Sequence, residues 1–511
     1  MGSECPGCAA TRATVTDLRP TQHVQLPEDV LDHGPEAVGL SRRSLLRAGA
    51  LGSIAVYGSS VLGVDTIFGS ASAAAAAGPN TVLVLLYLQG GSDGLGMVNP
   101  GSGSSQYGAY ATARPALHRI QGVSSGGLVG SQDIPGTGGS LAWSNMLLSS
   151  AAGGDNGSST YGFDTLWGNG SGDATSNLAL LPSVDYTPAN LSHFDSSDYW
   201  FAGALTGMST GWLGRWVDNN GSATNPLQAV SLNSALSKAI RPALNPVCSI
   251  LPTSGGKTPS LGFSMHTSGG YDIPPGAGST ANINAQMTAQ SQIAAGAGNA
   301  ALARSRASYG QAVTVAGEAG SVNSLAAPTP TYPAGSLSNQ LKLAARLIAA
   351  KLGTRVITIH WGSFDTHGSQ LAGQDPQLAT LSQALGAFQA DLIARKTATD
   401  DFEPNVVTMV FSEFGRRLAE NDAAGTDHGA GGVVLLSGSA VKGGLCAPAA
   451  NLGAPDTYGN LVPTTDFRAV YHSVLADWLG GDLTGVIPNE PVGGYTPGIS
   501  RYDATAPTLF R

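Results

Sequence analysis

Residues 81–94 read TVLVLLYLQGGSDG, and this stretch decides the fold class. Residues 81–88 form a nearly continuous apolar run, which predicts a strand buried on both faces of a sheet. The run ends in a glycine-rich turn that carries Asp93. In open parallel sheets, ligands bind beyond the C-terminal ends of the strands. Asp93 is therefore the first candidate for a functional residue.

Similar apolar runs recur in the C-terminal half, where they alternate with helical patterns. We expect strands at residues 355–362, 405–411 and 432–438, and helices at residues 336–352, 377–392 and 466–481. This alternation predicts an α/β fold with right-handed crossovers and a mostly parallel sheet that has helices on both faces. Residues 120–180 and 250–335 are rich in Gly, Ser, Ala and Pro, so we expect loop-rich insertions there, with at most a helix near 282–318.

The composition argues against a nucleic-acid-binding protein. Charged residues make up only 12% of the 511 residues, the net charge is −9, and no cluster of Lys and Arg is present. Proteins that bind nucleic acids usually carry a basic patch. We expect instead one large α/β domain over residues 79–511.

The N-terminal segment resembles an export signal. Arg42-Arg43 precede a weakly apolar stretch that ends in small residues around Ala71-Ser72-Ala73, the layout of a twin-arginine signal with an A-x-A cleavage site. The stretch is rich in Gly and Ser and would make a poor membrane anchor, so we expect cleavage rather than a retained span. We predict a leader over residues 1–78 and a periplasmic, cell-wall or extracellular protein.

The chain contains four cysteines. Cys5 and Cys8 form a C-x-x-C pair, but they lie in the predicted leader, and no second pair completes a zinc site. Cys248 and Cys446 remain in the mature chain. A disulfide between them is possible outside the cytoplasm, and the sequence leaves this question open.

Acidic, histidine and arginine side chains stand beside the predicted strands at several places. They are Asp93 after the first strand, His360, Asp365 and His367 after the second, Glu413 and Arg416 after the third, and Asp427 and His428 before the fourth. Each has an ordinary explanation when taken alone, such as a turn residue, a helix cap or a packed histidine. Together they predict a shared site. Carboxylate and imidazole donors favour one or two divalent ions, zinc or manganese.

A further candidate lies in LSHFDSSDYWFAGA, residues 191–204. Ser192 stands at the start of a predicted helix, where backbone N–H groups can hold an anion and a nearby metal can activate the hydroxyl as a nucleophile. A plain helix N-cap is the stronger explanation for Ser192 alone. Arg416 is a candidate to clamp an anionic substrate.

Several motifs resemble the domain of unknown function 1501 family over about residues 80–485. In chain order they are LQGGSDGLGMVNP, LSHFDSSDYW, GWLGRWVD, SFDTHGSQ, FSEFGRR, GTDHGAGG and DFRAVYHSVLADWLGG. The resemblance implies a distant relationship to the alkaline-phosphatase-like group, which includes phosphatases, sulfatases and cofactor-independent phosphoglycerate mutases. It therefore implies an alkaline-phosphatase-like core.

The resemblance also implies roles for individual residues. Asp93 would bind a metal, Ser192 would be the nucleophile, and Asp365 with His367 would bind the first ion, although the group usually spaces this pair more widely. An adjacent Asp-His pair serves the second ion in that group, and two alignments compete for it here.

In the first alignment, Asp427-His428 is the pair that serves the second ion. In the second, which we prefer, the strand at 405–411 delivers Glu413-Phe414, and His428 is the later histidine. Phe414 cannot bind a metal, so the second site would lack an imidazole unless His193 or Asp427 replaces it.

The sequence therefore predicts an exported metal-dependent hydrolase of phosphate or sulfate esters, with a small anionic ester as its substrate. The alternative is a catalytically inactive exported protein that keeps the fold and binds or assembles with a protein partner. Phe414 and the long insertions favour this alternative. Carbohydrate binding through Trp200, Trp212 and Trp216 is a weaker third hypothesis, because aromatic residues at such spacing more often belong to a core.

Overall fold

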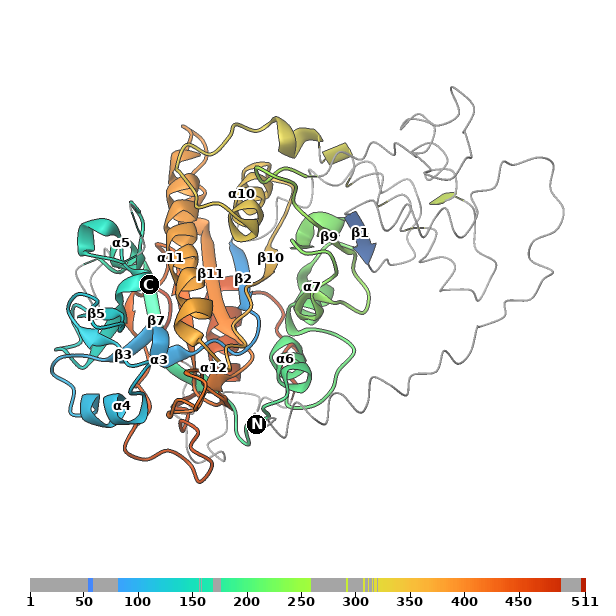
Figure 1. The fold of residues 1–511 in the computed structure, drawn as a ribbon. Coiled ribbons are helices and arrows are strands. Elements are labelled where there is room, and N and C mark those ends of the chain that lie inside the picture. The colour runs from blue at the N-terminus through green and yellow to red at the C-terminus, as the bar shows by residue number, and fades with distance from the viewer. Residues whose placement is uncertain are drawn as a thin grey trace, which may run out of the picture. The chain divides into compact units, whose positions relative to one another are not determined.

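A ten-stranded sheet forms the centre of the protein (Figure 1). The computed structural model describes residues 54–57, 81–258 with gaps at 156, 158 and 169–175, isolated positions between 291 and 320, and residues 321–488 and 507–511. Across the sheet, the strands are β1 (Ile54–Tyr57), β9 (Val247–Ile250), β8 (Ala229–Ser231), β10 (Val356–Trp361), β2 (Val82–Leu88), β11 (Val406–Ser412), β14 (Gly432–Ser437), β7 (Leu178–Asp185) and β15 (Gly444–Leu445), and β16 (Thr465–Asp466) also pairs with β7.

The prediction of a largely parallel sheet is confirmed. β9, β8, β10, β2 and β11 are parallel neighbours, whereas β14 runs antiparallel to both β11 and β7. A parallel neighbour needs a long crossover, usually a helix. Between β11 and β14 the chain forms only the short hairpin of β12 (Gly415–Arg416) and β13 (His428–Gly429), so it re-enters the sheet from the edge at which it left.

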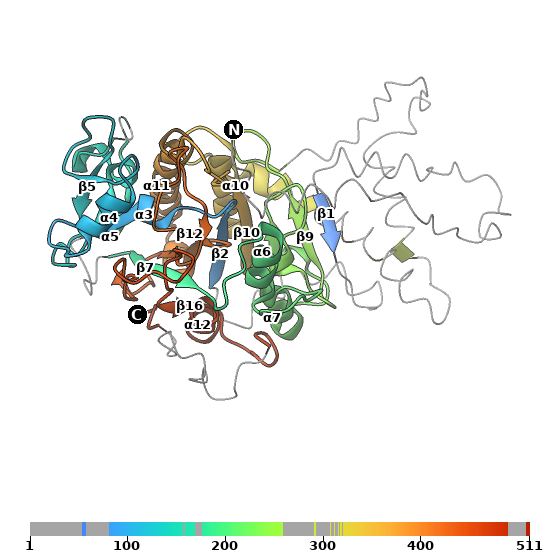
Figure 2. The ribbon, with the colours of Figure 1, turned by 60° about the horizontal axis from the view of Figure 1, so that its bottom comes forward.

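Helices cover both faces of the sheet, as the alternation of strands and helices predicts. Along β2, Val82, Val84 and Leu86 join one buried cluster, while Leu83 and Leu85 join another. The first cluster includes α10 (Ser336–Ala349) and α11 (Gln370–Ala394), and the second includes α6 (His193–Ala202), α7 (Trp212–Asn220) and α12 (Phe467–Ser473). Figure 2 shows α10 and α11 on one side of the sheet and α7 and α12 on the other.

One helix begins earlier than the sequence-based prediction of 377–392. α11 begins at Gln370 and passes through Pro376, although proline lacks the N–H of a helical hydrogen bond. The helix predicted over 466–481 is confirmed, because α12 continues as a π-helix over Val474–Leu479 and ends at Gly480. Trp200, Trp212 and Trp216 lie in the second buried cluster with at most 2% of their surface exposed, so they are core residues and not a sugar-stacking surface.

The expectation of a loop-rich insertion at 120–180 is wrong in part. This region contributes the first residues of strand β7 of the central sheet. It also contributes most of a second, four-stranded sheet that is made of β3 (Val98–Pro100), β6 (Leu141–Ser144), β5 (Gly130–Asp133) and β4 (Ile120–Gln121). Trp143 packs edge-on against Phe163 and Trp167, with ring centroids 5.5 Å apart in each pair. A few large aromatic residues thus supply a core that the Gly- and Ser-rich composition conceals.

Several other expectations fall on residues outside the described part of the chain. These are the Arg42-Arg43 signal, the cleavage site, and nearly all of the proposed helix near 282–318. Within the predicted leader only Ile54–Tyr57 is described, and it pairs antiparallel with β9 at the sheet edge. None of the helices in the described residues combines the length and the apolar character needed to span a bilayer.

The structure answers the open question about a disulfide. Cys248 lies in β9, near one end of the sheet, and Cys446 follows β15 at the other end. Both thiols are free. The width of the sheet separates the two residues, so they do not form a disulfide with each other.

Candidate metal centre

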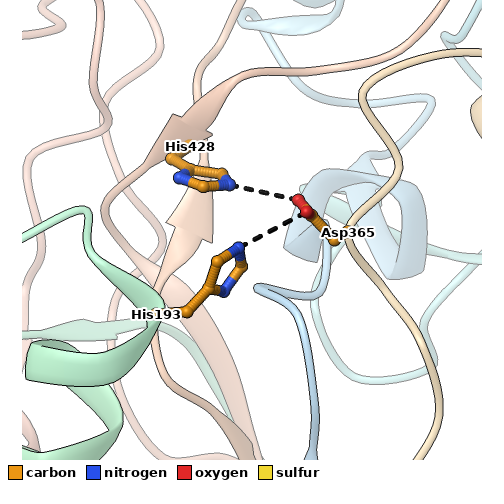
Figure 3. A group of neighbouring side chains, drawn as sticks. All are labelled: His193, Asp365 and His428. Carbon is orange, nitrogen blue, oxygen red and sulfur yellow. Dashed lines mark hydrogen bonds and ion pairs between the residues drawn. The ribbon is translucent and has the colours of Figure 1, made fainter. Parts of the chain in front are cut away.

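Three side chains from distant parts of the sequence meet at the C-terminal edge of the parallel strands (Figure 3). His193 is the first residue of α6, Asp365 lies in the loop after β10, and His428 opens β13. His428 Nε2 lies 3.1 Å from Asp365 Oδ1, and His193 Nε2 lies 3.5 Å from Asp365 Oδ2. One ligand atom from each residue lies within 4.8 Å of the other two, a spacing that could hold one metal ion.

The outer ring nitrogen of each histidine is held by a second partner. His193 Nδ1 lies 2.8 Å from Glu413 Oε1, and His428 Nδ1 lies 2.9 Å from the carbonyl oxygen of Leu191. A carbonyl oxygen only accepts, so Nδ1 of His428 donates to Leu191, and Nε2 is the ring nitrogen that faces Asp365. Histidines that bind metals almost always donate their other N–H to such a carboxylate or carbonyl.

A third imidazole repeats this arrangement. His367 Nε2 lies 3.0 Å from Asp365 Oδ1 and 2.9 Å from His428 Nε2, while His367 Nδ1 lies 3.5 Å from Asp427 Oδ1. Asp427 thus stands behind His367, at the same outer position that Glu413 takes behind His193. Asn421 Nδ2 donates to Asp427 Oδ1 over 3.2 Å and helps to fix it.

Glu413 is buried and lies outside the central group. Its carboxylate accepts hydrogen bonds from Gly90 N at 2.9 Å and from Ser412 Oγ at 3.0 Å, in addition to its contact with His193. Gly90 has a φ of 108°, and a Cβ at this position would lie 2.5 Å from the backbone nitrogen of Asp365. Only glycine therefore lets this turn approach Asp365 while it binds Glu413.

Phe414 forms an apolar floor beneath the imidazoles. Its ring centroid lies 4.9 Å from that of His193 and 4.6 Å from that of His428. The side chain is buried, and its ring packs against Gly91, where an added Cβ would lie 2.2 Å from Phe414 Cε2. The preferred alignment gives no imidazole at this position, and the hydrocarbon ring of Phe414 lies there beside His193.

Arg416 does not have the surroundings of a substrate clamp. Its buried guanidinium donates to the carbonyl oxygens of Gly90, Gly91, Phe364 and Thr426, and to Asp365 Oδ1 at 2.9 Å. These internal acceptors occupy the guanidinium and leave it no surface for an anion from solution. Arg416 instead ties the loop after β2 to Asp365.

The structure does not bring Asp93 into the central group. The side chain is buried, and both of its oxygens bind Arg114, at 2.5 and 3.0 Å, while Gln370 Nε2 donates to Oδ2 over 2.6 Å. Burial alone would raise the pKa of Asp93, but Arg114 outweighs it and holds this pKa below the usual value. Asp93 is thus placed as the partner of a buried arginine and not as a ligand at this centre.

Ser192 and His360 also have partners of their own. Ser192 is the N-cap of α6, and its Oγ accepts from Asp195 N at 3.4 Å. His360 Nε2 contacts Ser237 Oγ at 2.8 Å, its ring stacks on Phe201, and burial lowers its pKa to about 4. The expectation that His360 is a packed histidine is confirmed. The ordinary N-cap explanation for Ser192 describes its observed contact.

The electrostatics of the group favour an ionised carboxylate beside a neutral imidazole. Burial opposes ionisation of Asp365, yet hydrogen bonds from His193, His367, His428 and Arg416 hold its pKa far below the usual value. Burial lowers the pKa of His428. For His193, burial alone would lower the pKa, but Asp365 and Glu413 outweigh it and raise the pKa to about 9. Deprotonated carboxylates and neutral imidazoles are the forms that bind metals, so Asp365 and His428 are in the binding form, whereas His193 must release a proton when an ion binds.

Comparison with known families identifies the chain. A family described as "Protein of unknown function (DUF1501)" matches residues 81–476. The protein belongs to this family. Comparisons with curated proteins and with solved structures gave no match. The segment that defines this DUF1501 protein contains His193, Asp365 and His428, together with the outer partners that orient them.

Some groups that shape the centre and its surroundings in the DUF1501 chain could not be recognised from the sequence. The carbonyl group of Leu191 orients His428, yet a backbone atom leaves no trace in residue type. Arg114, the partner of Asp93, is an unremarkable arginine in the sequence. Gly90 stands in a visible glycine-rich turn, and this signal could have indicated a close approach between two backbones.

Proposed function

We propose that this DUF1501 protein is a metal-dependent hydrolase of phosphate or sulfate esters, and that one divalent ion, zinc or manganese, binds His193, Asp365 and His428. The observation that carries the proposal is the orientation of the rings. Both Nε2 atoms face one carboxylate, while both Nδ1 atoms are held by outer partners.

The donor set fits the chemistry. Two imidazole nitrogens and one carboxylate oxygen are typical of catalytic zinc sites, which keep a further position for water or substrate. A divalent ion bound there would supply a Lewis acid for an ester oxygen. His367 adds a further nitrogen next to the group, and Phe414 supplies a wall that excludes water beneath it. The donors of this arrangement support one ion more directly than two.

Export by the twin-arginine route remains part of the proposal and is supported by Arg42-Arg43 and the small residues at Ala71-Ser72-Ala73. This route carries folded proteins. A centre whose ligands come from α6, the loop after β10 and β13 forms only once the domain has folded, so it is the kind of centre such a route would carry intact.

A second candidate function is a catalytically inactive binding or assembly protein. The observation that favours it is the internal pairing of two predicted functional charges. Arg416, the expected substrate clamp, and Asp93, the expected metal ligand, both bind groups of the protein itself. The two functions differ in whether the centre turns over an ester, and one experiment separates them.

The test compares the wild-type protein with the Asp365→Ala/His428→Ala double variant and with His472→Ala, which removes a half-buried histidine from α12. We expect close to one equivalent of zinc or manganese by elemental analysis in the wild type and in His472→Ala, and none in the double variant. Phosphate- or sulfate-ester hydrolysis should fall on the order of a thousandfold only in the double variant. Metal binding without turnover would favour the second function, and activity that survives in the double variant would overturn the first.

A further inference from the structure

Two adjacent arginines beside the centre have opposite surroundings. Arg416 is buried and donates to several carbonyl oxygens and to Asp365. Arg417 has 40% of its side chain exposed, and its Nη1 lies 3.8 Å from Asp427 Oδ2, which is too long for a hydrogen bond. Its Nε is buried without a hydrogen-bond partner among the described residues.

The backbone of Arg417 is fixed even though its side chain is not. Arg417 N donates to the carbonyl oxygen of Asp427 over 3.1 Å, and the carbonyl oxygen of Arg417 accepts from Arg114 Nη2 at 2.8 Å. The preceding residue, Arg416, pairs with His428 across the β12–β13 hairpin. The backbone from which the Arg417 side chain extends is therefore held in place beside His428.

A short chain of contacts links this guanidinium to the centre. Arg417 lies beside Asp427, Asp427 lies 3.5 Å from His367 Nδ1, and His367 Nε2 lies 3.0 Å from Asp365 Oδ1. Asp427 is 39% exposed. It attracts the guanidinium, but at 3.8 Å it accepts no hydrogen bond from it, and no other acceptor of the guanidinium is found in the described part of the chain.

A buried donor without a partner costs free energy, and the cost is larger for a charged group. A bound ligand that supplies the missing acceptor removes this cost. The planar fork of an arginine matches two oxygens of a phosphate or sulfate group. Arg417 has this fork available, half-exposed and next to the centre, whereas the fork of Arg416 is filled.

We infer that Arg417 binds the anionic group of the substrate. The substrate class is then an ester whose charged phosphate or sulfate group sits at the metal centre, and neutral carboxylic esters are excluded from efficient use. This inference rests on the proposed function for its chemistry, but the binding of an anion by Arg417 is measurable without turnover.

The test uses the full-length, metal-loaded protein with Arg417→Gln, Arg417→Lys and a matched control, Lys442→Gln. Lys442 is exposed and follows β14, whose antiparallel direction carries the chain to the opposite edge of the sheet. Inorganic phosphate and inorganic sulfate are titrated separately by calorimetry. Initial rates are measured for 4-nitrophenyl sulfate, bis(4-nitrophenyl) phosphate and the neutral 4-nitrophenyl acetate.

We expect Arg417→Gln to weaken binding of the inorganic anion by about ten- to a hundredfold and to raise KM for the charged esters by a similar factor. Arg417→Lys should recover part of the loss, because it keeps the charge and loses the fork. Lys442→Gln should match the wild type, and metal content should be equal in all four proteins. Rates with 4-nitrophenyl acetate should not change.

The inference is overturned if neither anion binds the wild-type protein, or if both bind Arg417→Gln as tightly as the wild type. It is also overturned if Arg417→Gln changes KM equally for charged and neutral esters. A protein that hydrolyses none of the esters but loses anion binding in Arg417→Gln would refute the proposed hydrolase and support the role of Arg417.

Discussion

Asp93 and Asp365 occupy equivalent places in the fold, and the structure gives them opposite surroundings. Each follows one of two neighbouring parallel strands, β2 and β10, at the same edge of the sheet. Asp93 is 1% exposed and bound by Arg114 and Gln370, whereas the side chain of Asp365 is 41% exposed and faces three imidazoles. A strand end supplies a position for a functional residue, but the partners of the side chain decide what it does.

The largest expected effect concerns Asp365, the acid that faces the imidazoles. Asp365→Asn removes the charge that all three imidazoles face while keeping the shape of the side chain. We expect metal affinity to fall at least about a hundredfold. Ester hydrolysis should fall on the order of a thousandfold. The side chain is exposed in part, and the buried Arg416 keeps its carbonyl acceptors when it loses this ion pair, so the free energy of unfolding should fall by about 1–3 kcal/mol. Elemental analysis, rate assays and urea unfolding measure the three quantities.

The matching change at Asp93 should lower the stability of the fold and leave metal binding intact. Asp93→Asn leaves Arg114 buried with an unpaired charge, so we expect the free energy of unfolding to fall by about 3–5 kcal/mol. Metal content per folded molecule should stay unchanged. Denaturant unfolding of Asp93→Asn and of the double variant Asp93→Asn/Arg114→Gln measures the coupling, and the double variant should recover part of the loss. Loss of metal in folded Asp93→Asn would show that Asp93, like Asp365, is needed for metal binding.

A third acid at this edge has neither an arginine nor imidazoles as partners. Asp185 ends β7 and is buried, and burial raises its pKa to about 7 from an ordinary value of 3.8. The folded state then binds a proton that the unfolded state releases between these values, so the contribution of Asp185 to the free energy of unfolding should fall by up to a few kcal/mol as the pH rises from about 4 to about 7. The lowered pKa of His360 acts in the opposite direction over the same range, so the contribution of Asp185 is the difference between the wild type and a variant without this carboxyl group. Thermal unfolding across this range measures the slope.

Asp185→Asn is the control for that slope. The backbone N–H groups of Tyr186 and Gly431 each donate to an oxygen of Asp185 at 2.9 Å, so the amide leaves one of them poorly paired and lowers stability at every pH. Relative to the wild type, the variant should nevertheless gain stability as the pH rises from about 4 to about 7, because it lacks the contribution of Asp185. An unchanged slope would assign the effect to other groups.

The smallest expected effect concerns Ser192, which stands next to His193. If its hydroxyl serves only as the N-cap of α6, Ser192→Ala should lower the free energy of unfolding by about 1 kcal/mol. Hydrolysis should then stay within about threefold of the wild type, measured at saturating substrate. A loss as large as that expected for Asp365→Asn would instead identify Ser192 as the nucleophile that its place in the sequence suggested.

Much of the fold could be predicted because its central strands are continuous apolar runs. β2, β10 and β11 lie where their side chains indicate, and so does α10. The direction of β14 could not be predicted, because it depends on the hairpin that precedes it and not on its own residues. The small sheet around Trp143 could not be predicted either, because its strands are short and its core depends on a few distant aromatic contacts.

The sequence indicated the place of the centre better than the role of each residue. Asp365, His367 and His428 were predicted to share a site and lie together, with His193 beside them. Residue type alone could not separate Asp365 from Asp93, or Arg416 from Arg417. Those differences arise from tertiary partners, such as the four carbonyl groups around Arg416, which are backbone atoms common to every residue.

The free thiols of Cys248 and Cys446 bear on where this protein can mature. Disulfides form in oxidising compartments, and no bond between these two cysteines holds the fold together. The domain can therefore reach its final structure in the reducing interior of the cell in which it is made. If the chain leaves by the route that its leader predicts and holds the proposed ion, that ion would be selected by the metal concentrations of this interior. Its identity would then reflect the compartment in which the protein folds and not the compartment in which it acts.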